Sequence, residues 1–341
     1  MKGKRITIKD IAQRLNLSTS TVSRALTSHS DVKAETRKLV TSLAEELDYY
    51  PDPLAVNLKQ RKTKIIGLIL PKIVNRFFSK ALAGIQEVVN REGYNIIISQ
   101  SDESIHTEKK NVEDMLANRV DGLLVSLSKE TMSAEHFLKV LNTETPIVFF
   151  DRVNEELETS RVIIDDYEAS YKAVDHLIEQ GCKRIAHVAG PPNLINCKNR
   201  LEGYKDAIKN NGIFLDKKLI VFSSYERDDV EVHTKYFLSL KHPPDGIFAI
   251  NDASAIQMIH HIKKAGFSIP GDIAIIGFNN EANGEFIDPP LSTVDSPALQ
   301  LGKSAARLLF DHIDNEERPA TCEIIKSRLV IRESSLRSNK K

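Results

Sequence analysis

Five side chains in one short segment near the N-terminus are suited to contact with double-stranded DNA. They are Thr19, Ser20, Thr21, Ser23 and Arg24. Short hydroxyl side chains let a helix enter the major groove without steric conflict, and they can form hydrogen bonds with base edges or phosphates. A guanidinium group can donate two parallel hydrogen bonds to a guanine. This chemistry requires a helix that holds the five side chains on an exposed face.

Residues 7–47 show the pattern of a helix-turn-helix followed by a third helix. Thr7 is a suitable N-cap, and apolar residues recur after it at helical spacing. Asn16 tolerates a left-handed backbone conformation and can therefore turn the chain, after which Ser18 can cap the second helix. The third helix is predicted over residues 32–47. The alternative is a small three-helix bundle with a polar face and no role in nucleic-acid binding.

The distribution of charge favours a DNA-binding head. The whole chain has 47 basic and 47 acidic residues. Residues 1–62 contain 12 Lys or Arg and seven Asp or Glu residues, which gives this segment a formal charge of +5 and the remainder −5. A small basic module joined to a larger acidic body is typical of proteins that bind nucleic acid through one module.

These residues resemble the DNA-binding head of LacI/GalR-type transcriptional repressors. The resemblance rests on the stretches Thr7-Ile-Lys-Asp-Ile-Ala, Leu17-Ser-Thr-Ser-Thr-Val-Ser-Arg-Ala-Leu, Glu35-Thr-Arg and Glu46-Leu-Asp-Tyr-Tyr-Pro. Asn16 departs from the family, which usually has Gly in this turn. The resemblance implies that Thr19, Ser20 and Arg24 occupy the main base-reading positions. The full set of side chains expected to contact DNA in the head adds Thr21, Ser23 and His29.

Residues 51–63 are predicted to form a short hinge helix. Asp52 at the N-cap and Pro53 at the first helical position are a strong helix-start signal. A helix this short is only marginally stable alone, so it should fold when something packs on it. In the LacI/GalR family the corresponding helix pairs with its dimer mate in the minor groove, and Leu58 matches the leucine that wedges between base steps there. The alternative is a solvated linker.

From residue 64 onward, short apolar runs alternate with helical patterns. Continuous apolar runs suit strands buried on both faces of a parallel sheet, and their alternation with helices predicts an α/β fold. The predicted strands are 65–70, 94–99, 122–125, 147–150, 162–164, 185–189, 246–250 and 273–278. The pattern resembles the type I periplasmic-binding-protein fold, which forms the body of LacI/GalR regulators. The predicted fold class is therefore an all-α helix-turn-helix head followed by a two-lobed, periplasmic-binding-protein-like α/β body.

The resemblance implies that the chain crosses three times between the two lobes of the body. We place these crossings near Val162, Leu291 and Cys322, so that each lobe is discontinuous in sequence. The predicted organisation is a head (1–50), a hinge (51–63), an N-lobe (64–162 plus 292–322), a C-lobe (163–291 plus 323–336) and a tail (337–341).

Polar and aromatic side chains follow many of the predicted strands. In open α/β sheets ligands bind beyond the carboxyl ends of the strands, so these side chains predict the ligand site. They are Asn75, Arg76, Phe77, Phe78, Ser101, Asp102, Asp151, Arg152, Asp165, Asp166, Arg200, Asn251, Asp252, Asn279 and Asn280. Carboxylates, amides and a guanidinium group beside aromatic rings suit a small polyhydroxylated ligand. The chain has no Trp, so the aromatic side chain that stacks on a sugar must be Phe77, Phe78 or Tyr225.

The candidate effector-binding residues are seven side chains around the predicted cleft. The resemblance matches six of them to effector contacts of the family, and the full set is Phe77, Phe78, Asp151, Arg200, Tyr225, Asn251 and Asn279. Asn279 departs from the family, which often has Asp there, and this exchange of a carboxylate for an amide leaves the ligand class open. For Asp165, Asp166 and Asp252, a helix cap or a contact between the lobes is the simpler interpretation, and Phe77 has the alternative of a place in the core.

Two other classes of protein fit the sequence less well. Nucleotide-binding, hydrolase and zinc-protease motifs are missing, and the three cysteines lack the spacing of a zinc site, so we expect no enzyme, no cofactor and no metal. A transport-type sugar-binding protein would need an export signal and no basic head, whereas this basic N-terminus has no apolar stretch behind it. No apolar run approaches the ~20 residues that a membrane span needs.

The sequence therefore predicts a cytoplasmic, homodimeric regulator of transcription, most simply a repressor. It is expected to bind a near-palindromic operator in double-stranded DNA, because a two-fold symmetric dimer reads two related half-sites. A small effector held between the lobes, a sugar or sugar derivative, is expected to control the operator affinity.

Overall fold

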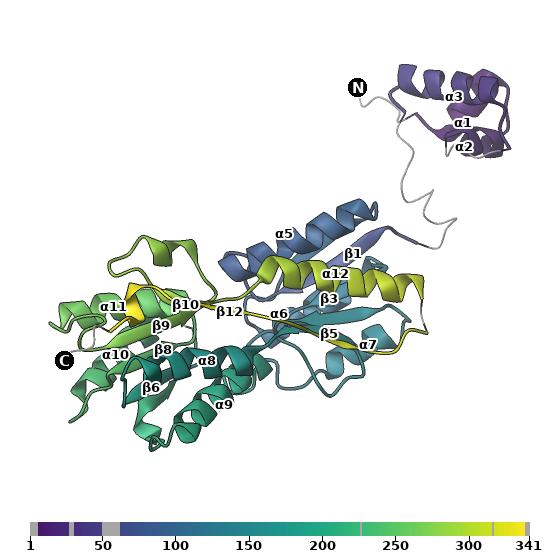
Figure 1. Ribbon diagram of the computed structural model, residues 1–341. Coiled ribbons are helices and arrows are strands. Elements are labelled where there is room, and N and C mark those ends of the chain that lie inside the picture. The colour runs from purple at the N-terminus through teal and green to yellow at the C-terminus, as the bar shows by residue number, and fades with distance from the viewer. Residues whose placement is uncertain (1–5, 27–30, 50–61, 226, 316, 338–341) are drawn as a thin grey trace. The chain divides into compact units, whose positions relative to one another are not determined.

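The computed structural model of the chain describes residues 6–26, 31–49, 62–225, 227–315 and 317–337 (Figure 1). The chain divides between Thr63 and Lys64 into two compact units. The first unit contains the helical head and the second is the body, which consists of two lobes.

Three helices form the head, and they are α1 (Ile8–Leu15), α2 (Thr19–Leu26) and α3 (Ala34–Glu46). The Asp10 carboxylate accepts hydrogen bonds from the backbone N–H and the hydroxyl of Thr7, at 2.7 and 2.6 Å, and so stabilises the start of α1. Asn16 ends α1 in the left-handed conformation with a φ of 52°. Ile11 and Val40 are buried between the helices. The predicted helix-turn-helix is confirmed, with a third helix that begins slightly later than predicted.

A six-stranded parallel sheet forms the centre of the N-lobe. Its strands in spatial order are β11 (Cys322–Ile325), β5 (Ser160–Ile164), β4 (Ile147–Phe150), β3 (Gly122–Val125), β1 (Ile65–Leu70) and β2 (Asn95–Gln100). One face packs against α5 (Arg76–Arg91) and α12 (Ala298–Asp314), and the other against α6 (Ile105–Ala117), the 3-10 turn η1 (Glu135–Phe137) and α7 (Leu138–Leu141). Coverage on both faces explains the continuous apolar character of β1.

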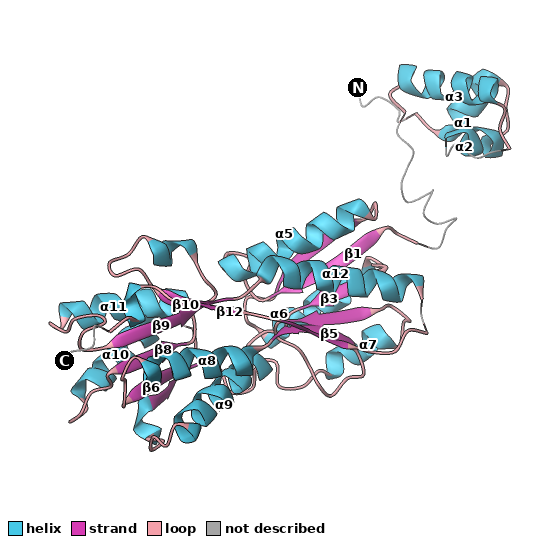
Figure 2. Ribbon diagram, in the orientation of Figure 1, coloured by secondary structure: helices cyan, strands magenta, loops and turns pink. Residues whose placement is uncertain are grey.

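The C-lobe repeats this plan with one antiparallel edge. Its strands in spatial order are β12 (Arg328–Val330), β10 (Ser292–Asp295), β9 (Ala274–Phe278), β8 (Gly246–Ala249), β6 (Ile185–Ala189) and β7 (Ile220–Phe222), and only the β10–β12 pairing is antiparallel. Helices α8 (Asp166–Glu179) and α9 (Ile195–Asn210) cover one face, and α10 (Arg227–Ser239) and α11 (Asp252–Lys264) lie on the other (Figure 2). Short 3-10 turns are η2 (Lys217–Leu219), η3 (Ala282–Glu285) and η4 (Glu333–Ser335).

The chain passes between the two sheets three times, after β5, β10 and β11. β10 pairs with β9 of the C-lobe, and β11 pairs with β5 of the N-lobe. The predicted crossings near Val162, Leu291 and Cys322 therefore come too early along the chain. β10 and β11 are short and contain polar residues, so an apolar run does not mark them as strands. β7 and β12 were missed because each is only three residues long.

Two glycines bring α5 and α12 into backbone contact. A side chain at Gly84 would collide with the carbonyl oxygen of Leu299, and one at Gly302 would collide with that of Ala81. The contact joins the first helix of the body to a helix from near its C-terminus, and both helices lie on the same face of the sheet (Figure 1). Only residues without a side chain allow this approach.

The described part of the chain contains no helix with both the length and the apolar character to cross a membrane. Within the same residues, no group of three or more His, Cys, Asp or Glu side chains is placed to hold a metal ion. All three cysteines are free thiols, of which Cys182 and Cys197 are buried and Cys322 is exposed.

Candidate functional site

The exposed face of α2 carries the side chains predicted to contact DNA. Ser18 Oγ accepts a hydrogen bond from the backbone N–H of Thr21 at 3.1 Å and so caps the helix. Val22 and Ala25 are buried against the other head helices, which turns the opposite face outward. On that face Thr19, Ser20 and Arg24 are exposed, and Thr21 and Ser23 are half-buried.

Arg24 makes a contact within its own helix, since its Nε donates a hydrogen bond to the backbone carbonyl of Ser20 at 3.4 Å. The other two predicted DNA contacts, His29 and Leu58, lie outside the described residues. Residues 51–61 of the predicted hinge also lie outside them.

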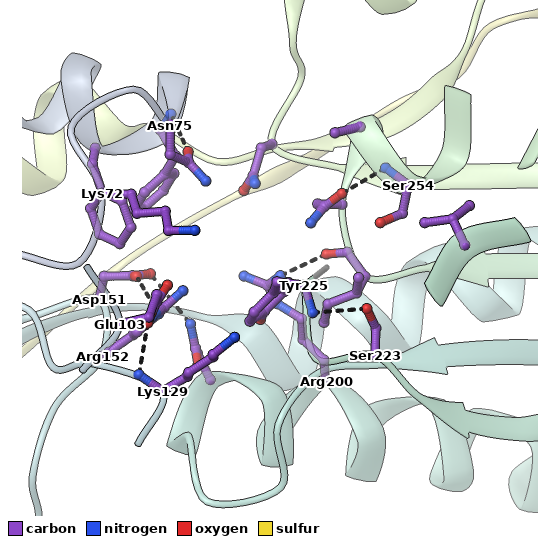
Figure 3. A pocket seen from close by; sticks show the side chains of 18 of the residues that line it. Lys72, Asn75, Glu103, Lys129, Asp151, Arg152, Arg200, Ser223, Tyr225 and Ser254 are labelled. Atoms are coloured by element: carbon purple, nitrogen blue, oxygen red, sulfur yellow. Dashed lines mark hydrogen bonds and ion pairs between the residues drawn. The ribbon is translucent and has the colours of Figure 1, made fainter. Parts of the chain in front are cut away.

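A cavity of about 220 Å³ lies between the two lobes at the carboxyl ends of their strands (Figure 3). Ligands bind at this edge of open α/β sheets. The side chains that line the cavity include all seven predicted effector-binding residues, namely Phe77, Phe78, Asp151, Arg200, Tyr225, Asn251 and Asn279. The structure thus brings together residues that are far apart in the sequence.

Arg200 projects from α9 into the C-lobe side of the cavity. Its Nε donates a hydrogen bond to Asp166 Oδ1 at 2.7 Å, and its Nη1 donates one to the carbonyl of Ile250 at 2.9 Å. The guanidinium carbon lies 3.6 Å from the centre of the Phe278 ring. Burial disfavours the charged form, but the neighbouring Asp166 carboxylate raises the pKa of Arg200 above its ordinary value. Nη2 has no hydrogen-bond partner among the described residues and can donate to a ligand.

Arg152 forms a second buried ion pair on the N-lobe side. Its Nη1 lies 2.9 and 2.7 Å from the two carboxylate oxygens of Glu103. The guanidinium carbon lies 5.5 Å from the ring centres of both Phe78 and Tyr225. Each arginine of the cavity therefore has a carboxylate partner from its own lobe, which avoids an unpaired buried charge.

Asp151 is a buried carboxylate with few hydrogen bonds. It follows β4 and has a φ of 60°, a left-handed conformation that Asp adopts more readily than most residue types. Oδ1 accepts one long hydrogen bond from Asn196 at 3.5 Å, and Oδ2 lies 4.0 Å from Arg152 Nε. Burial raises the pKa of Asp151 to about 6, although the adjacent Arg152 opposes the shift. Because an ionised carboxylate can accept about four hydrogen bonds, Asp151 can still accept several from a ligand.

Three aromatic side chains provide apolar walls. Phe77 and Phe78 begin α5 and meet edge to face, with ring centres 5.5 Å apart. Tyr225 comes from the C-lobe, and its hydroxyl lies 3.1 Å from Cys197 Sγ. A side chain at Gly190 would collide with both of these groups, so a glycine is needed behind Tyr225. Phe77 and Phe78 are almost fully buried, and they contribute to the N-lobe core as well as to the cavity.

Two asparagines extend the C-lobe wall. Asn251 Oδ1 accepts a hydrogen bond from the backbone N–H of Ser254 at 2.8 Å and caps α11. The interpretation of Asp252 as the cap is wrong, because Asp252 is buried and instead accepts hydrogen bonds from the hydroxyl of Thr293 and a backbone N–H, both at 2.6 Å. Asn279 has a φ of 103°, and its Oδ1 is buried without a hydrogen-bond partner among the described residues.

Several cavity residues were not predicted. Lys72 and Lys129 follow β1 and β3, so the rule of strand ends could have found them. Ser223 follows β7, whose three residues were not recognised as a strand. Asn196 and Gln257 lie on helices, and no pattern in the sequence marks them.

Other polar residues at strand ends have structural roles outside the cavity. Asp165 accepts hydrogen bonds from the backbone N–H and the hydroxyl of Ser327, at 2.9 and 2.6 Å, and so fixes the segment that crosses between β11 and β12. Asn280 Oδ1 accepts a hydrogen bond from Arg332 at 3.0 Å. Of the residues predicted to lie at strand ends, those that do not line the cavity are Arg76, Ser101, Asp102, Asp165, Asp166, Asp252 and Asn280.

Two protein-family models match the chain. One is described as bacterial regulatory proteins of the lacI family and matches residues 7–52. The other is described as a periplasmic binding protein-like domain and matches residues 174–335. These matches cover the helix-turn-helix and much of the two-lobed body.

Known proteins resemble the chain over most or all of its length. The HTH-type transcriptional repressor CytR of Escherichia coli K12 is 32% identical over 329 residues, which are 96% of either chain. The crystal structure of the lac repressor dimer, bound to operator and the anti-inducer ONPF, has a TM-score of 0.88 at 23% identity and covers 98% of this chain and 100% of its own. A LacI family regulator from Enterococcus faecium with bound ribose has a TM-score of 0.71 at 27% identity and covers 79% of this chain and 98% of its own. The chain belongs to the lacI family of bacterial regulatory proteins, which are DNA-binding regulators of transcription.

Proposed function

We propose that this protein is a cytoplasmic homodimer that represses transcription from a near-palindromic operator, and that a monosaccharide or a close derivative bound between the lobes controls its operator affinity. The proposal of a sugar ligand rests on the interlobe cavity, in which hydrogen-bonding groups and aromatic walls converge. The role is regulatory, so the bound sugar leaves chemically unchanged.

The size of the cavity supports a small ligand. At about 220 Å³ it lies below the range of roughly 300–1,000 Å³ that is usual for ligand pockets. A monosaccharide suits this volume better than an oligosaccharide does. The bound ribose in the Enterococcus faecium regulator is consistent with such a ligand.

The polar groups of the cavity suit a ligand with several hydroxyls. Asp151 has free acceptor positions for hydroxyl donors, and Arg200 Nη2 can donate to a ring or hydroxyl oxygen. Asn251 and Asn279 can add amide contacts from the C-lobe wall. The rings of Phe77, Phe78 and Tyr225 can cover the apolar face of a sugar.

We assign operator recognition to α2 and to the hinge segment. Thr19, Ser20 and Arg24 present hydrogen-bonding groups suited to base edges, with Thr21 and Ser23 at the margin of the same surface. His29 is assigned a DNA contact from the sequence alone. Leu58 is assigned the role of a wedge in the minor groove, which would bend the duplex. Coupling between ligand and operator of this kind is typically about 1–3 kcal/mol and must be reciprocal.

Two measurements on the full-length protein test the proposal. Genomic footprinting identifies the operator, and calorimetry with a monosaccharide panel headed by D-ribose identifies the ligand. We expect one sugar to bind, to change the operator affinity and to be recovered unchanged. Binding of disaccharides alone, chemical turnover of the sugar, or the absence of any protected DNA site would each contradict the proposal.

The hinge assignment has its own test. We expect Leu58→Ala to weaken operator binding and reduce DNA bending, measured by gel-shift circular permutation, with sugar affinity unchanged. A variant that binds and bends the operator like the original protein would exclude the wedge.

A further inference from the structure

The loop that follows β3 makes contacts across the interlobe boundary. Within this 128–131 loop, the backbone carbonyls of Lys129 and Thr131 accept hydrogen bonds from Asn193 Nδ2 of the C-lobe, at 2.8 and 3.3 Å. Lys129 Nζ also donates to the carbonyl of Ser224 at 2.9 Å. These bonds join the lobes through protein groups alone. Of the residues that make them, only Lys129 also lines the cavity.

Two buried carboxylates fix the shape of this loop. Glu108 Oε2 accepts a hydrogen bond from the N–H of Ser128 at 2.7 Å, and Oε1 accepts one from the hydroxyl of Thr131 at 2.8 Å. Glu103 Oε2 accepts one from the N–H of Lys129 at 2.7 Å. The side chain of Glu108 is completely buried. The acids therefore set the direction of the two carbonyls that meet Asn193.

Glu108 is surrounded by hydrogen-bond donors. His136 Nε2 lies 2.9 Å from Glu108 Oε1, which adds a third group to those of Ser128 and Thr131. An amide at this position has only one oxygen, so either the N–H of Ser128 would lose its acceptor or the Thr131 hydroxyl and His136 would both have to change from donor to acceptor, at a buried site where a mismatch is costly. The loop geometry consequently depends on a carboxylate and not merely on a polar side chain.

Apolar packing accompanies the polar contacts. Ile195, at the start of α9 in the C-lobe, packs against the hydrophobic cluster of the N-lobe that includes Leu127 and Phe137. Asn193 lies two positions before it along the chain. One short segment of the C-lobe thus contacts the N-lobe through both an amide and an apolar side chain.

We propose that Asn193 and the 128–131 loop form a clamp that holds the two lobes closed, and that Glu108 and Glu103 are positioning residues for it. Neither Asn193 nor Glu108 lines the cavity. Both act on the equilibrium between open and closed lobes. Because a ligand that contacts both walls binds the closed form, the closed fraction scales its apparent affinity. The clamp thus tunes the sensitivity of the regulator, and it does so through Asn193, whose side chain does not line the cavity.

Asn193→Asp is the most direct test of the clamp. It preserves size but turns a donor into a carboxylate that faces two carbonyl oxygens. The matched control is Asn210→Asp at the end of α9, where the amide donates a hydrogen bond to the Tyr171 hydroxyl within the C-lobe. Spin labels at Val74 of the N-lobe and Phe286 of the C-lobe, which are 90% and 83% exposed, report the interlobe distance by double electron–electron resonance. The exposed Cys322 is replaced by Ser, and labelled chains are diluted with unlabelled ones so that only distances within one chain contribute.

We expect Asn193→Asp to raise the open-to-closed ratio of the full-length, sugar-free protein by roughly tenfold, since two hydrogen bonds become repulsive contacts. Asn210→Asp should leave the distance distribution unchanged. Equal distributions for Asn193→Asp and the original protein would overturn the proposal. The measurement uses no sugar and no operator, so its failure is distinct from a failure of the proposed function.

Glu108→Gln tests the positioning role. We expect the same shift to longer distances. We expect no further shift when it is combined with Asn193→Asp, because both variants disrupt the same contact, the one between Asn193 and the 128–131 loop. Additive shifts would show that Glu108 acts only on the N-lobe itself and would overturn its role in the clamp. If Glu108→Gln does not fold, Thr131→Val, which removes one donor to the carboxylate, is measured in its place and in the same combination.

Discussion

The face of α2 that we propose contacts DNA and the cavity of the body use polar side chains in opposite ways. On α2 the side chains of Thr19, Ser20 and Arg24 are exposed, and the hydrogen bonds described for them are local, as between Arg24 and the Ser20 carbonyl. In the cavity Arg152 and Arg200 are buried, and each is bonded to a carboxylate. An exposed basic surface suits a polyanion whose counterions it displaces. A buried and charge-paired site suits a small ligand that is selected by its hydrogen bonds.

The largest expected effect is that of salt, which should lower the operator affinity steeply and leave the sugar affinity almost unchanged. For roughly six to ten phosphate contacts, operator affinity should fall by about 10³- to 10⁵-fold between 50 and 200 mM salt. Sugar affinity should change by less than about twofold, because the cavity charges are buried and paired. Fluorescence anisotropy and calorimetry in the same buffers measure both. A flat operator response would contradict the role of the basic head.

Arg200→Lys should weaken sugar binding by about 100-fold while operator affinity without sugar stays the same. An ammonium group cannot bond the Asp166 carboxylate, the Ile250 carbonyl and a ligand in the planar geometry of a guanidinium group, and a hydrogen bond to a charged group is worth about 1.5–3 kcal/mol. Calorimetry measures the change. The matched control is Arg184→Lys, which alters an ion pair with Asp216 outside the cavity. Equal sugar affinity in both variants would remove Arg200 from the site.

Arg24→Ala should weaken operator binding by roughly tenfold and relax the preference for one base pair in each half-site. Sugar affinity should not change. Arg14→Ala is the control, because it removes the same charge from the end of α1 and not from α2. Selection of operator variants distinguishes the two. If Arg14→Ala relaxed the base preference as much as Arg24→Ala, the assignment of α2 as the reading helix would be wrong.

The smallest expected effect is a pH dependence confined to the cavity. Burial raises the pKa of Asp151 to about 6, so this carboxyl gains a proton as the pH falls through that value. Sugar hydroxyls donate to the ionised form, and protonation therefore opposes binding. Sugar affinity should be about fourfold lower at pH 5.5 than at pH 7.5. Asp151→Asn should bind weakly with no such dependence, and an affinity that rises toward acid pH would reject this role.

The positions of the cavity residues were predictable because topology fixes the ends of parallel strands. Asn251 follows β8 by two positions, and Asn279 and Asp151 directly follow β9 and β4, so recognising those strands was enough to place the residues. Asn16 was predictable for a different reason, since few residue types accept the left-handed conformation that ends α1.

The partners of these residues could not be predicted. Glu103 and Arg152 are 49 positions apart, and Asp166 and Arg200 are 34 apart, so no local spacing relates them. Their pairing depends on how the loops of each lobe fold over the sheet. The same limit applies to β10, whose sequence Ser-Thr-Val-Asp shows no apolar run. Its place in the sheet is set by pairing with β9 and β12.

The contact between α5 and α12 makes one half of the body mechanically stiff. Because Gly84 and Gly302 let the two backbones touch, neither helix can slide or roll past its neighbour without a collision between main-chain atoms. Strain applied at the cavity end of α5, where Phe77 and Phe78 begin the helix, is therefore conveyed along its length as one displacement and is not absorbed by local rearrangement. We therefore expect the N-lobe to move as a rigid body, with bending confined to the three strand connections that join it to the C-lobe.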